Sequence, residues 1–489
     1  MSSLKPPLQN SGRPQEPDGA DLDKLRKWQE DRVARKLKGE YESAVSHLAD
    51  IVNENLSTHL RIATVRVQGA KHTRRSFLDW LVNPWLSPQL SPLDVDKPST
   101  LQNVLHTARG ISHVLQETDL FQSVEAKIER SRDMLAKEGD VDIIFKTREK
   151  GRFFLKTSTE LGNSEGNASA TARIRNVFGG AETLEANLSL GTQTRRSFHT
   201  LLSMPLSSSL RTKGELSLFA LDRDLSSYAS ASEGLRGFKA AVRSDLRSSG
   251  VHEITYEAVL RHIGNLIPSA SPSIREVAGQ TLKSSISHRW TRDTRDDKIT
   301  ATRGLYTKVF QEFAGLGGDA FFYKAEVEGQ ASRRVLPGVA LSFAARTGFI
   351  RSFTPQAPFS DRFQLGGPLS VRSFRANGMG PRDGVDSLGG DIYWSTGISL
   401  ISDIPRKPHW PVKSHLFVNA GRLDVMDKSK NLAENFSDCL SKPSVSAGVG
   451  LIYRFDPVRV EVNFGVPIVS SKSDGARRGF QVGIGLDFL

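Results

Sequence analysis

Few side chains in this sequence have the type and spacing that covalent chemistry requires. His106 and His113 lie seven residues apart in a helical pattern and are more typical of surface or packing residues than of metal ligands. The sequence has no H-E-x-x-H run, no G-x-S-x-G elbow and no phosphate-binding G-x-x-x-x-G-K-[ST] loop. We therefore expect a protein that is not an enzyme, with no cofactor and no metal, and that works by hydrogen bonding and packing.

Composition narrows the class of protein further. The 489 residues carry a formal net charge of +12, a mean hydropathy of −0.34 and one cysteine, Cys439. No stretch approaches the roughly 18–20 apolar residues of a transmembrane helix, and a single cysteine excludes a disulfide-stapled secreted protein. The positive charge fits an anionic partner or basic side chains inside a barrel, and no basic–aromatic motif supports nucleic acid as the partner.

Residues 1–60 form an extension of their own. Residues 1–20 contain four prolines and no apolar core, so we expect them to be disordered and to be neither a secretory signal nor a mitochondrial presequence. This favours synthesis in the cytosol. Residues 21–56 are highly charged, with apolar residues at roughly helical spacing, and they predict an exposed helix.

Residues 61–150 predict a compact α+β domain. Apolar–polar alternation at 61–69 is followed by two helical patterns, and then by alternation at 124–128 and 141–145. The expected order is β-α-α-β-β. Two helices on a three-stranded sheet can bury a single core.

From Arg152 onward the helical periodicity ends, and segments of about 9–12 residues alternate apolar and polar side chains. At 458–466, for example, valines and Phe464 alternate with Arg459, Glu461 and Asn463. Such alternation suits a transmembrane barrel, with lipid outside and water inside. A soluble β-protein would need to cover its apolar face, and no helical pattern follows residue 150 to do so. About sixteen such segments predict an all-β transmembrane barrel over residues 151–489.

One long excursion, residues 350–388, interrupts these segments, and loops of that length are usually functional. It contains the run FQLGGPLSVRSFRANGMGP, followed by LGGDIYWSTGISL. Within it, Val371-Arg372-Ser373-Phe374 resembles the Val/Ile-Arg-Gly-Phe/Tyr signature of the BamA/TamA-type assembly-factor superfamily. The surrounding glycine motifs are similar to those of the core β-barrel subunits of the mitochondrial sorting and assembly machinery (SAM).

The resemblance covers residues 61–489 and implies that the domain at 61–150 is POTRA-like. It also implies that the long loop folds into the barrel and is anchored there by an arginine paired with acidic side chains on nearby strands. The loop-anchor residues carried over by the match are Val371, Arg372, Phe374, Gly378 and Gly380.

The match departs from the family pattern at two places. Ser373 stands where the family has glycine, and Ser399 and Asn419 stand where carboxylate partners for the arginine are expected. Asp391 and Asp424 lie nearby in the sequence as alternative partners.

The last segment resembles the β-signal, the targeting pattern of mitochondrial barrel precursors, polar-x-Gly-x-x-apolar-x-apolar. The matching residues are Gln481, Gly483, Leu486 and Phe488. Any closing strand also alternates, and one strand can satisfy both requirements.

The two ends of the barrel suggest a mechanism. A barrel hides its backbone polar groups from lipid only when its first and last strands pair, and the glycines of the last strand should weaken that seam. We expect a precursor's β-signal to displace 479–488 and to pair with 152–160 by strand addition. The residues on one face of that first strand are Phe153, Leu155, Thr157 and Thr159.

The family resemblance implies insertion of β-barrel precursor proteins into the mitochondrial outer membrane, with the POTRA-like domain in the intermembrane space. It implies accessory SAM subunits on the cytosolic face and contact with membrane lipids. The alternative is a polypeptide-translocating pore of the same superfamily. A metabolite porin and a soluble basic binding protein are more distant alternatives.

Overall fold

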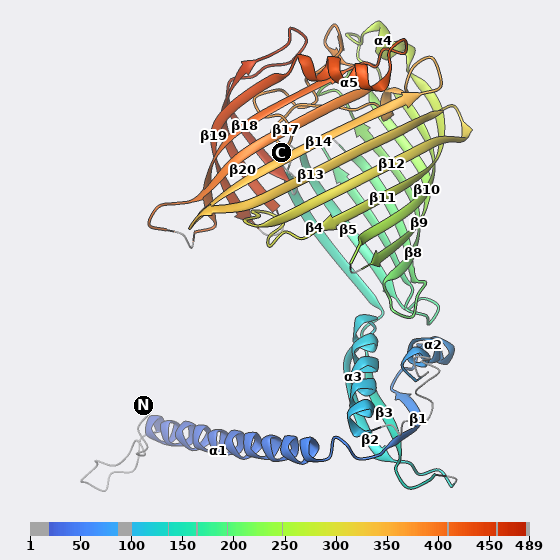
Figure 1. Ribbon diagram of the computed structural model, residues 1–489, viewed down its shortest axis with the longest axis vertical. Helices are drawn as coiled ribbons and strands as arrows, with labels where there is room; N and C mark the ends of the chain where they lie inside the picture. Colours follow the sequence, from blue (N-terminus) through green and yellow to red (C-terminus); the bar gives the residue numbers. More distant parts are fainter. Residues whose placement is uncertain are drawn as a thin grey trace, which may run out of the picture. The chain divides into compact units, whose positions relative to one another are not determined.

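The computed structural model describes residues 19–86, 100–134, 136–162, 165–192, 194–246, 248–407, 410–455 and 458–485. The chain divides into two compact units, one built mainly from the N-terminal elements and one that contains the whole of a large sheet (Figure 1). No helix among these residues is long and apolar enough to cross a membrane.

The N-terminal elements are a long helix followed by a small α+β arrangement. Helix α1 spans Gly19–Glu54. The next elements follow the predicted strand-helix-helix-strand-strand order: β1 (Arg61–Gln68), α2 (Arg75–Leu86), α3 (Leu101–Glu117), β2 (Phe121–Arg130) and β3 (Asp140–Glu149). The three strands form a sheet in the order β1-β3-β2. Buried residues of α3 recur at three- and four-residue spacing, which is why this segment forms an amphipathic helix.

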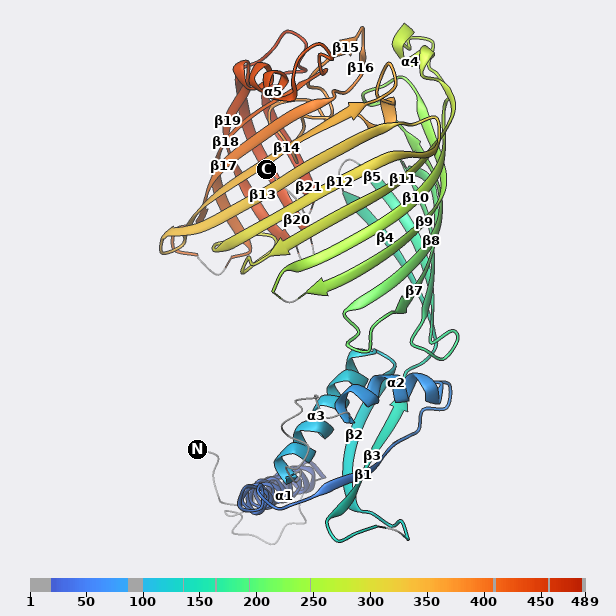
Figure 2. The same cartoon turned by 45° about the vertical axis from the view of Figure 1, so that its right-hand side comes forward.

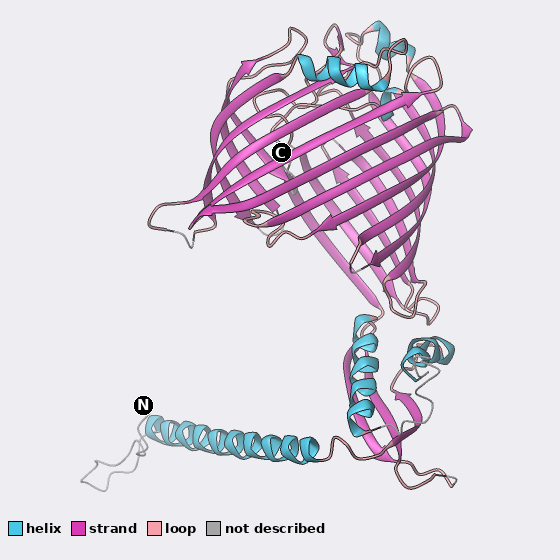
Figure 3. Ribbon diagram, viewed as in Figure 1, coloured by secondary structure: helices cyan, strands magenta, loops and turns pink. Residues whose placement is uncertain are grey.

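A sixteen-stranded antiparallel sheet makes up the rest of the fold (Figure 3). Each strand pairs with the next strand of this sheet along the chain, with β14 pairing with β17 across a long loop, and this agrees with the predicted fold class. The strands are β4 (Phe153–Gly162), β5 (Glu165–Arg175), β6 (Thr183–Gly191), β7 (Thr194–Pro205), β8 (Thr212–Asp224), β9 (Ser232–Leu246), β10 (Gly250–Gly264), β11 (Gly279–Asp293), β12 (Gly304–Gly318), β13 (Phe322–Leu336), β14 (Val339–Ser352), β17 (Ile392–Asp403), β18 (Val412–Asp424), β19 (Ser444–Phe455), β20 (Val458–Val469) and β21 (Gly479–Gly485).

The two faces of this sheet differ sharply in character. On β20, Val462 and Phe464 are 41% and 44% exposed, whereas Glu461 and Asn463 between them are almost completely buried. The sheet curls round on itself (Figure 2). The buried polar side chains therefore lie on its inner face and the exposed apolar side chains on its outer face. An apolar outer surface around a polar interior is the arrangement of a transmembrane barrel.

Two helices in the barrel region correct the prediction that none follows residue 150. Helix α4 (Pro272–Glu276) and helix α5 (Leu432–Ser441) both lie in connections between strands. Local capping explains them, because Ser271 accepts a hydrogen bond from Ile274 N, and Asn431 and Glu434 form a reciprocal capping box. Neither helix belongs to the repeating barrel pattern from which the prediction was made.

The long excursion between β14 and β17 runs from 353 to 391, a few residues later than the predicted 350–388. This lumenal loop (353–391) contains a short 3-10 turn, η1 (Phe359–Asp361), and a small hairpin, β15 (Arg382–Asp383) with β16 (Asp386–Ser387). Its apolar side chains join one buried cluster with inward residues of β12, β13, β14, β17 and β18. The loop is therefore packed against the inner wall of the barrel.

Candidate functional site

The four signature residues lie at the centre of the lumenal loop and are buried. Val371, Arg372, Ser373 and Phe374 each expose no more than 1% of their surface. The wall leaves room for them by using glycine: a Cβ at Gly465 would lie 2.2 Å from Ser373 Oγ, and one at Gly421 would lie 2.9 Å from Val371 Cγ2. The close approach of loop and wall thus depends on missing side chains in β18 and β20.

Arg372 is held by acceptors from two strands. Its Nε and Nη2 donate to Glu461 Oε2 of β20 at 3.1 and 2.9 Å, and its Nη1 donates to Asn419 Oδ1 of β18 at 3.1 Å. The guanidinium also lies over the ring of Phe417, 5.0 Å from the centroid. A fork of donors that meets a carboxylate, an amide and an aromatic face is a use that lysine cannot reproduce.

The acidic partner of Arg372 is therefore Glu461, and the two nearby alternatives, Asp391 and Asp424, are wrong. Asp391 forms an ion pair with Arg362, and Asp424 receives a bidentate pair from Arg422. Asn419 does contact Arg372, but as an amide acceptor.

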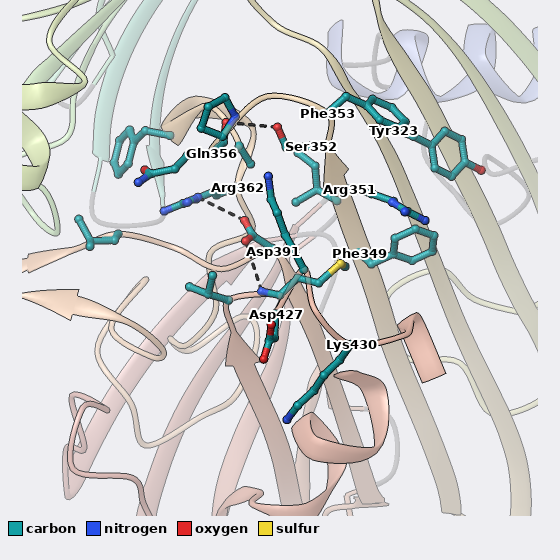
Figure 4. Close-up of a pocket in the computed structure, with 18 of the residues that line it drawn as sticks. Tyr323, Phe349, Arg351, Ser352, Phe353, Gln356, Arg362, Asp391, Asp427 and Lys430 are labelled. Atoms are coloured by element: carbon teal, nitrogen blue, oxygen red, sulfur yellow. Dashed lines mark hydrogen bonds and ion pairs between the residues drawn. The ribbon is translucent and has the colours of Figure 1, made fainter. Parts of the chain in front are cut away.

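Figure 4 shows Arg362 and Asp391 in a cavity of about 1030 Å³ at the end of the barrel where the lumenal loop begins. Asp391 also accepts a hydrogen bond from Met426 N at 3.3 Å. Asp391 therefore lies at the rim of the barrel, and its side-chain contacts are made there. Its carboxylate contacts Arg362 of the lumenal loop and the backbone that follows β18, and not Arg372.

Glu461 is shared with a second loop, which enters the barrel from the opposite end. Arg459 forms an ion pair with Glu461 and donates from Nη1 to Ile299 O at 3.1 Å. Ile299 belongs to the connection between β11 and β12, residues 294–303, called here the rim loop (294–303). Arg454 of β19 also pairs with Asp297 of this rim loop. One carboxylate on β20 thus links two inward loops through two arginines.

The lumenal loop has a second, separate anchor on the opposite wall. Arg261 of β10 makes a bidentate pair with Asp361 of η1, at 2.5 and 2.8 Å, and both side chains are buried. Lys283 of β11 lies 3.8 Å from Asp361 and pairs with Glu312 of β12 at 2.7 Å. Lys324 of β13 donates to Asp361 O at 2.9 Å. The loop is consequently tied to both walls.

The last strand is attached to the signature residues through Gln481. Its Oε1 accepts from Ser373 N at 2.8 Å, and its Nε2 donates to Phe374 O at 2.9 Å. Only a carboxamide can supply an acceptor and a donor side by side in this way. Gly483 is also buried on β21, whereas Leu486 and Phe488 lie outside the described residues.

The connection between β20 and β21 follows the lumenal loop closely. Arg477 N donates to Ser373 O, and Arg375 N donates to Gly475 O, both at 2.9 Å. The two glycines carried over with the signature take part as well. Gly475 N donates to Gly378 O at 2.7 Å, and Gly380 N donates to Asp474 Oδ1 at 3.0 Å. The chain that leads into β21 is therefore bonded to the loop along most of its length.

The first strand carries its predicted residues on an exposed surface. Phe153 and Leu155 of β4 are 77% and 73% exposed, and Thr157 and Thr159 are exposed as well. β4 and β21 are the two end strands of the sheet and lie beside each other. Among the residues that the structure describes, no ladder of paired residues joins them, whereas β20 pairs with β21 from Gly465↔Gly479 to Arg459↔Gly485.

The sequence pattern had singled out several of these residues, but it did not indicate that they contact one another. The alternation at 458–466 placed Arg459, Glu461 and Asn463 on the polar face, which was a usable signal for a lumenal cluster. The anchor formed by Arg261 and Asp361 was missed, because residues 100 positions apart show no common pattern.

The fold and the site together define a transmembrane β-barrel whose long inward loop is pinned by a buried arginine. An Omp85 superfamily domain matches residues 176–488. A SAM50-like protein of Schizosaccharomyces pombe is 35% identical over 458 residues, covering 92% of this chain and 95% of that protein. The chain belongs to the Omp85 superfamily and, within it, to the SAM50 homologues.

Further relatives agree with this assignment. The sorting and assembly machinery component 50 homolog of Homo sapiens is 28% identical over 404 residues, covering 81% of this chain and 86% of that protein. The crystal structure of BamA from Haemophilus ducreyi lacking POTRA domains 1–3 has the same fold, with a TM-score of 0.73 at 16% identity. That similarity covers 87% of this chain and 84% of the BamA chain.

Proposed function

We propose that this protein inserts and folds β-barrel precursors into the mitochondrial outer membrane by strand exchange at the seam between β4 and β21. The observation that carries the proposal is the way β21 is held. It pairs with β20 on one side, and its Gln481 is bonded to the lumenal loop. No ladder joins its described residues to β4.

Strand exchange requires that the backbone groups of β4 find partners at every stage. A precursor strand that carries the β-signal offers the same row of N–H and C=O groups as β21 does. Pairing such a strand with β4 satisfies those groups without covalent chemistry or an energy source. Further hairpins then add between β4 and β21 until the new barrel closes and leaves.

The lumenal loop supplies a place to read the incoming strand. When a precursor strand takes the place of β21, its polar β-signal residue occupies the position of Gln481. Ser373 N and Phe374 O then offer it one donor and one acceptor, spaced for a carboxamide. The arginine anchors keep this reading site in place while the seam is open.

The rest of the proposal follows from family membership. The POTRA-like domain, residues 61–150, lies in the intermembrane space and receives precursors, and accessory SAM subunits bind on the cytosolic face. Residues 151–489 form the membrane barrel. The protein performs no covalent catalysis.

The test is site-specific disulfide crosslinking with an arrested precursor that carries one cysteine in its last strand. Cys439, which is buried, is first removed by Cys439→Ala. Single cysteines are then introduced as Phe153→Cys, Leu155→Cys, Thr157→Cys and Thr159→Cys. We expect crosslinks that shift in register along β4, because a disulfide needs Cα atoms within about 7 Å.

Control variants make the outcome decisive. Leu305→Cys on the outer face of β12 and Arg243→Cys on the inner face of β9 should stay uncrosslinked. Crosslinks confined to the inner face would contradict strand exchange and favour the translocating pore.

The reading site is tested on the precursor itself. The precursor used has glutamine as the polar residue of its β-signal. Replacing that glutamine by glutamate removes the N–H that Phe374 O would accept, and it should lower the crosslinking yield about tenfold. An equal yield with glutamate would show that the loop does not read the side chain.

A further inference from the structure

The outer surface of β12, β13 and β14 is apolar over most of its height. Leu305, Leu341 and Phe343 are between 41% and 51% exposed, which marks the face that lipid covers. Ala331 of β13 is paired with both Leu305 and Phe343, so all of these side chains share that face. This apolar band ends near the turn at 337–338, at the rim where β4 begins.

Two arginines interrupt the apolar face at that rim. Arg333 is paired with Leu341, so it points outward with it. Arg303 lies two residues before Leu305 and continues the same face, in the position opposite Arg333. Both side chains are exposed, and among the described residues no carboxylate lies within ion-pair distance of either one.

The two arginines line a hollow of about 500 Å³. Its lining consists of Arg303, Ser332, Arg333, Arg334, Val335, Leu336 and Pro337. No acidic residue takes part, whereas Val335 and Leu336 are 57% and 60% exposed. The hollow is thus cationic at its edge and apolar beside it.

Like charges in opposing positions of neighbouring strands destabilise a sheet unless an anion lies between them. We propose that this hollow binds the phosphate headgroup of an anionic phospholipid, with Arg303 and Arg333 as its ligands. The acyl chains then lie along Leu305 and Phe343. A guanidinium pairs with phosphate through two parallel hydrogen bonds, which suits arginine better than lysine.

The position favours a lipid over a free anion. A soluble phosphate gains only the two arginines, whereas a lipid also covers the exposed apolar residues beside them. A zwitterionic lipid offers the same phosphate, but it brings a cation close to the two guanidinium groups. Selectivity for net negative charge is the feature that sets this site apart from general lipid contact.

The test measures lipid binding to the full chain in detergent, by native mass spectrometry and by the shift in unfolding temperature. The probes are phosphatidylglycerol, phosphatidylcholine and inorganic phosphate. We expect phosphatidylglycerol to be retained and to raise the unfolding temperature. The variant Arg303→Gln/Arg333→Gln should weaken its binding by about tenfold or more, since each basic side chain near a membrane surface contributes measurably to anionic lipid binding.

A matched control removes the same charge elsewhere. Arg292→Gln/Arg351→Gln deletes two exposed arginines that do not line the hollow, and should leave phosphatidylglycerol binding unchanged. Equal losses in both double variants would overturn the site in favour of diffuse attraction. An equal response to inorganic phosphate would overturn the assignment to lipid, and equal retention of phosphatidylcholine would overturn the selectivity.

Discussion

Ser373 shows how one residue can satisfy a geometry that the family meets with glycine. Its φ is +68°, in the left-handed region, where a side chain costs roughly 1–2 kcal/mol. That angle turns Ser373 N toward Gln481, while Ser373 O accepts from Arg477 N. A left-handed backbone conformation explains why glycine suits this position, and Ser373 adopts that conformation at some energetic cost.

The Arg372–Glu461 pair gives a prediction at the same scale. Glu461 is the counter-charge of two buried arginines, Arg372 and Arg459, so its loss leaves both uncompensated. We expect Arg372→Met to lower the free energy of unfolding by about 3–5 kcal/mol, and Glu461→Gln to lower it by at least as much. Urea unfolding in detergent measures both. A smaller effect for Glu461→Gln than for Arg372→Met contradicts the shared role.

A local motif was what singled out residues of the site from the sequence. Val371 to Phe374 and Gln481 lie in short patterns that can be recognised alone, and the structure brings them into contact. Glu461 lay on the predicted polar face, yet it is 89 residues from Arg372, so nothing local joined the two. Proximity of that kind depends on the curvature of the whole sheet.

At the scale of elements, the strands and the position of the lumenal loop were predictable, whereas the inward course of the rim loop (294–303) was not. Alternation is a direct consequence of a wall with lipid on one side and water on the other, as on β20, where Val462 and Phe464 are exposed and Glu461 and Asn463 are buried. The rim loop (294–303) has no periodicity. Its inward course is fixed by bonds to Arg454 and Arg459, both more than 150 residues away.

The second anchor of the lumenal loop can be tested by removing a charge at constant shape. Asp361→Asn leaves Arg261 and Lys283 without their shared counter-charge in a buried place. We expect a loss of about 3–5 kcal/mol in unfolding free energy. Asp438→Asn, which breaks an exposed pair with Lys430, should cost no more than about 1 kcal/mol. Similar small losses for both would show that the second anchor does not hold the loop.

The rim loop (294–303) also has an expected pH dependence. Burial alone would raise the pKa of Asp296, but hydrogen bonds from Thr302 Oγ1 and from the amides of Arg303, Thr302 and Asp297 lower it to about 2. A depressed carboxylate pKa contributes stability above the unfolded value, and that stability disappears as the pH falls through about 2.

We therefore expect the amides of Thr302 and Arg303 to remain protected from hydrogen exchange at pH 4 and to lose protection as the pH approaches 2. Asp296→Ala should remove the protection at pH 7 as well. Protection that survives in Asp296→Ala would place its origin elsewhere in the loop.

At the scale of the whole molecule, the sequence predicted the succession of a helix, a small α+β domain and a barrel, because each has its own periodicity. The family resemblance implied that the long loop folds into the barrel, but nothing in the sequence indicated the inward rim loop (294–303) or the segments that hold the long loop in place. Interior filling depends on which loops turn inward, and the bonds that decide this join distant segments: Asp386 of the lumenal loop, for example, accepts from Ser230 and Ser271, at least 115 residues away.

Two loops that enter from opposite ends and share one carboxylate also have an electrical consequence. An ion driven through the lumen by a voltage meets both loops and a buried cluster of fixed charges on β20. We expect the protein in a planar bilayer to pass much less current than an open barrel of the same strand number. Replacing 295–302 by two glycines should raise the current in discrete steps, whereas Arg303→Gln/Arg333→Gln, on the outer surface, should not. If the unmodified protein passed as much current as an open barrel, the two loops would not block the lumen. The small current expected here would instead show that the two inward loops block the lumen, so that the barrel does not conduct ions as an open pore.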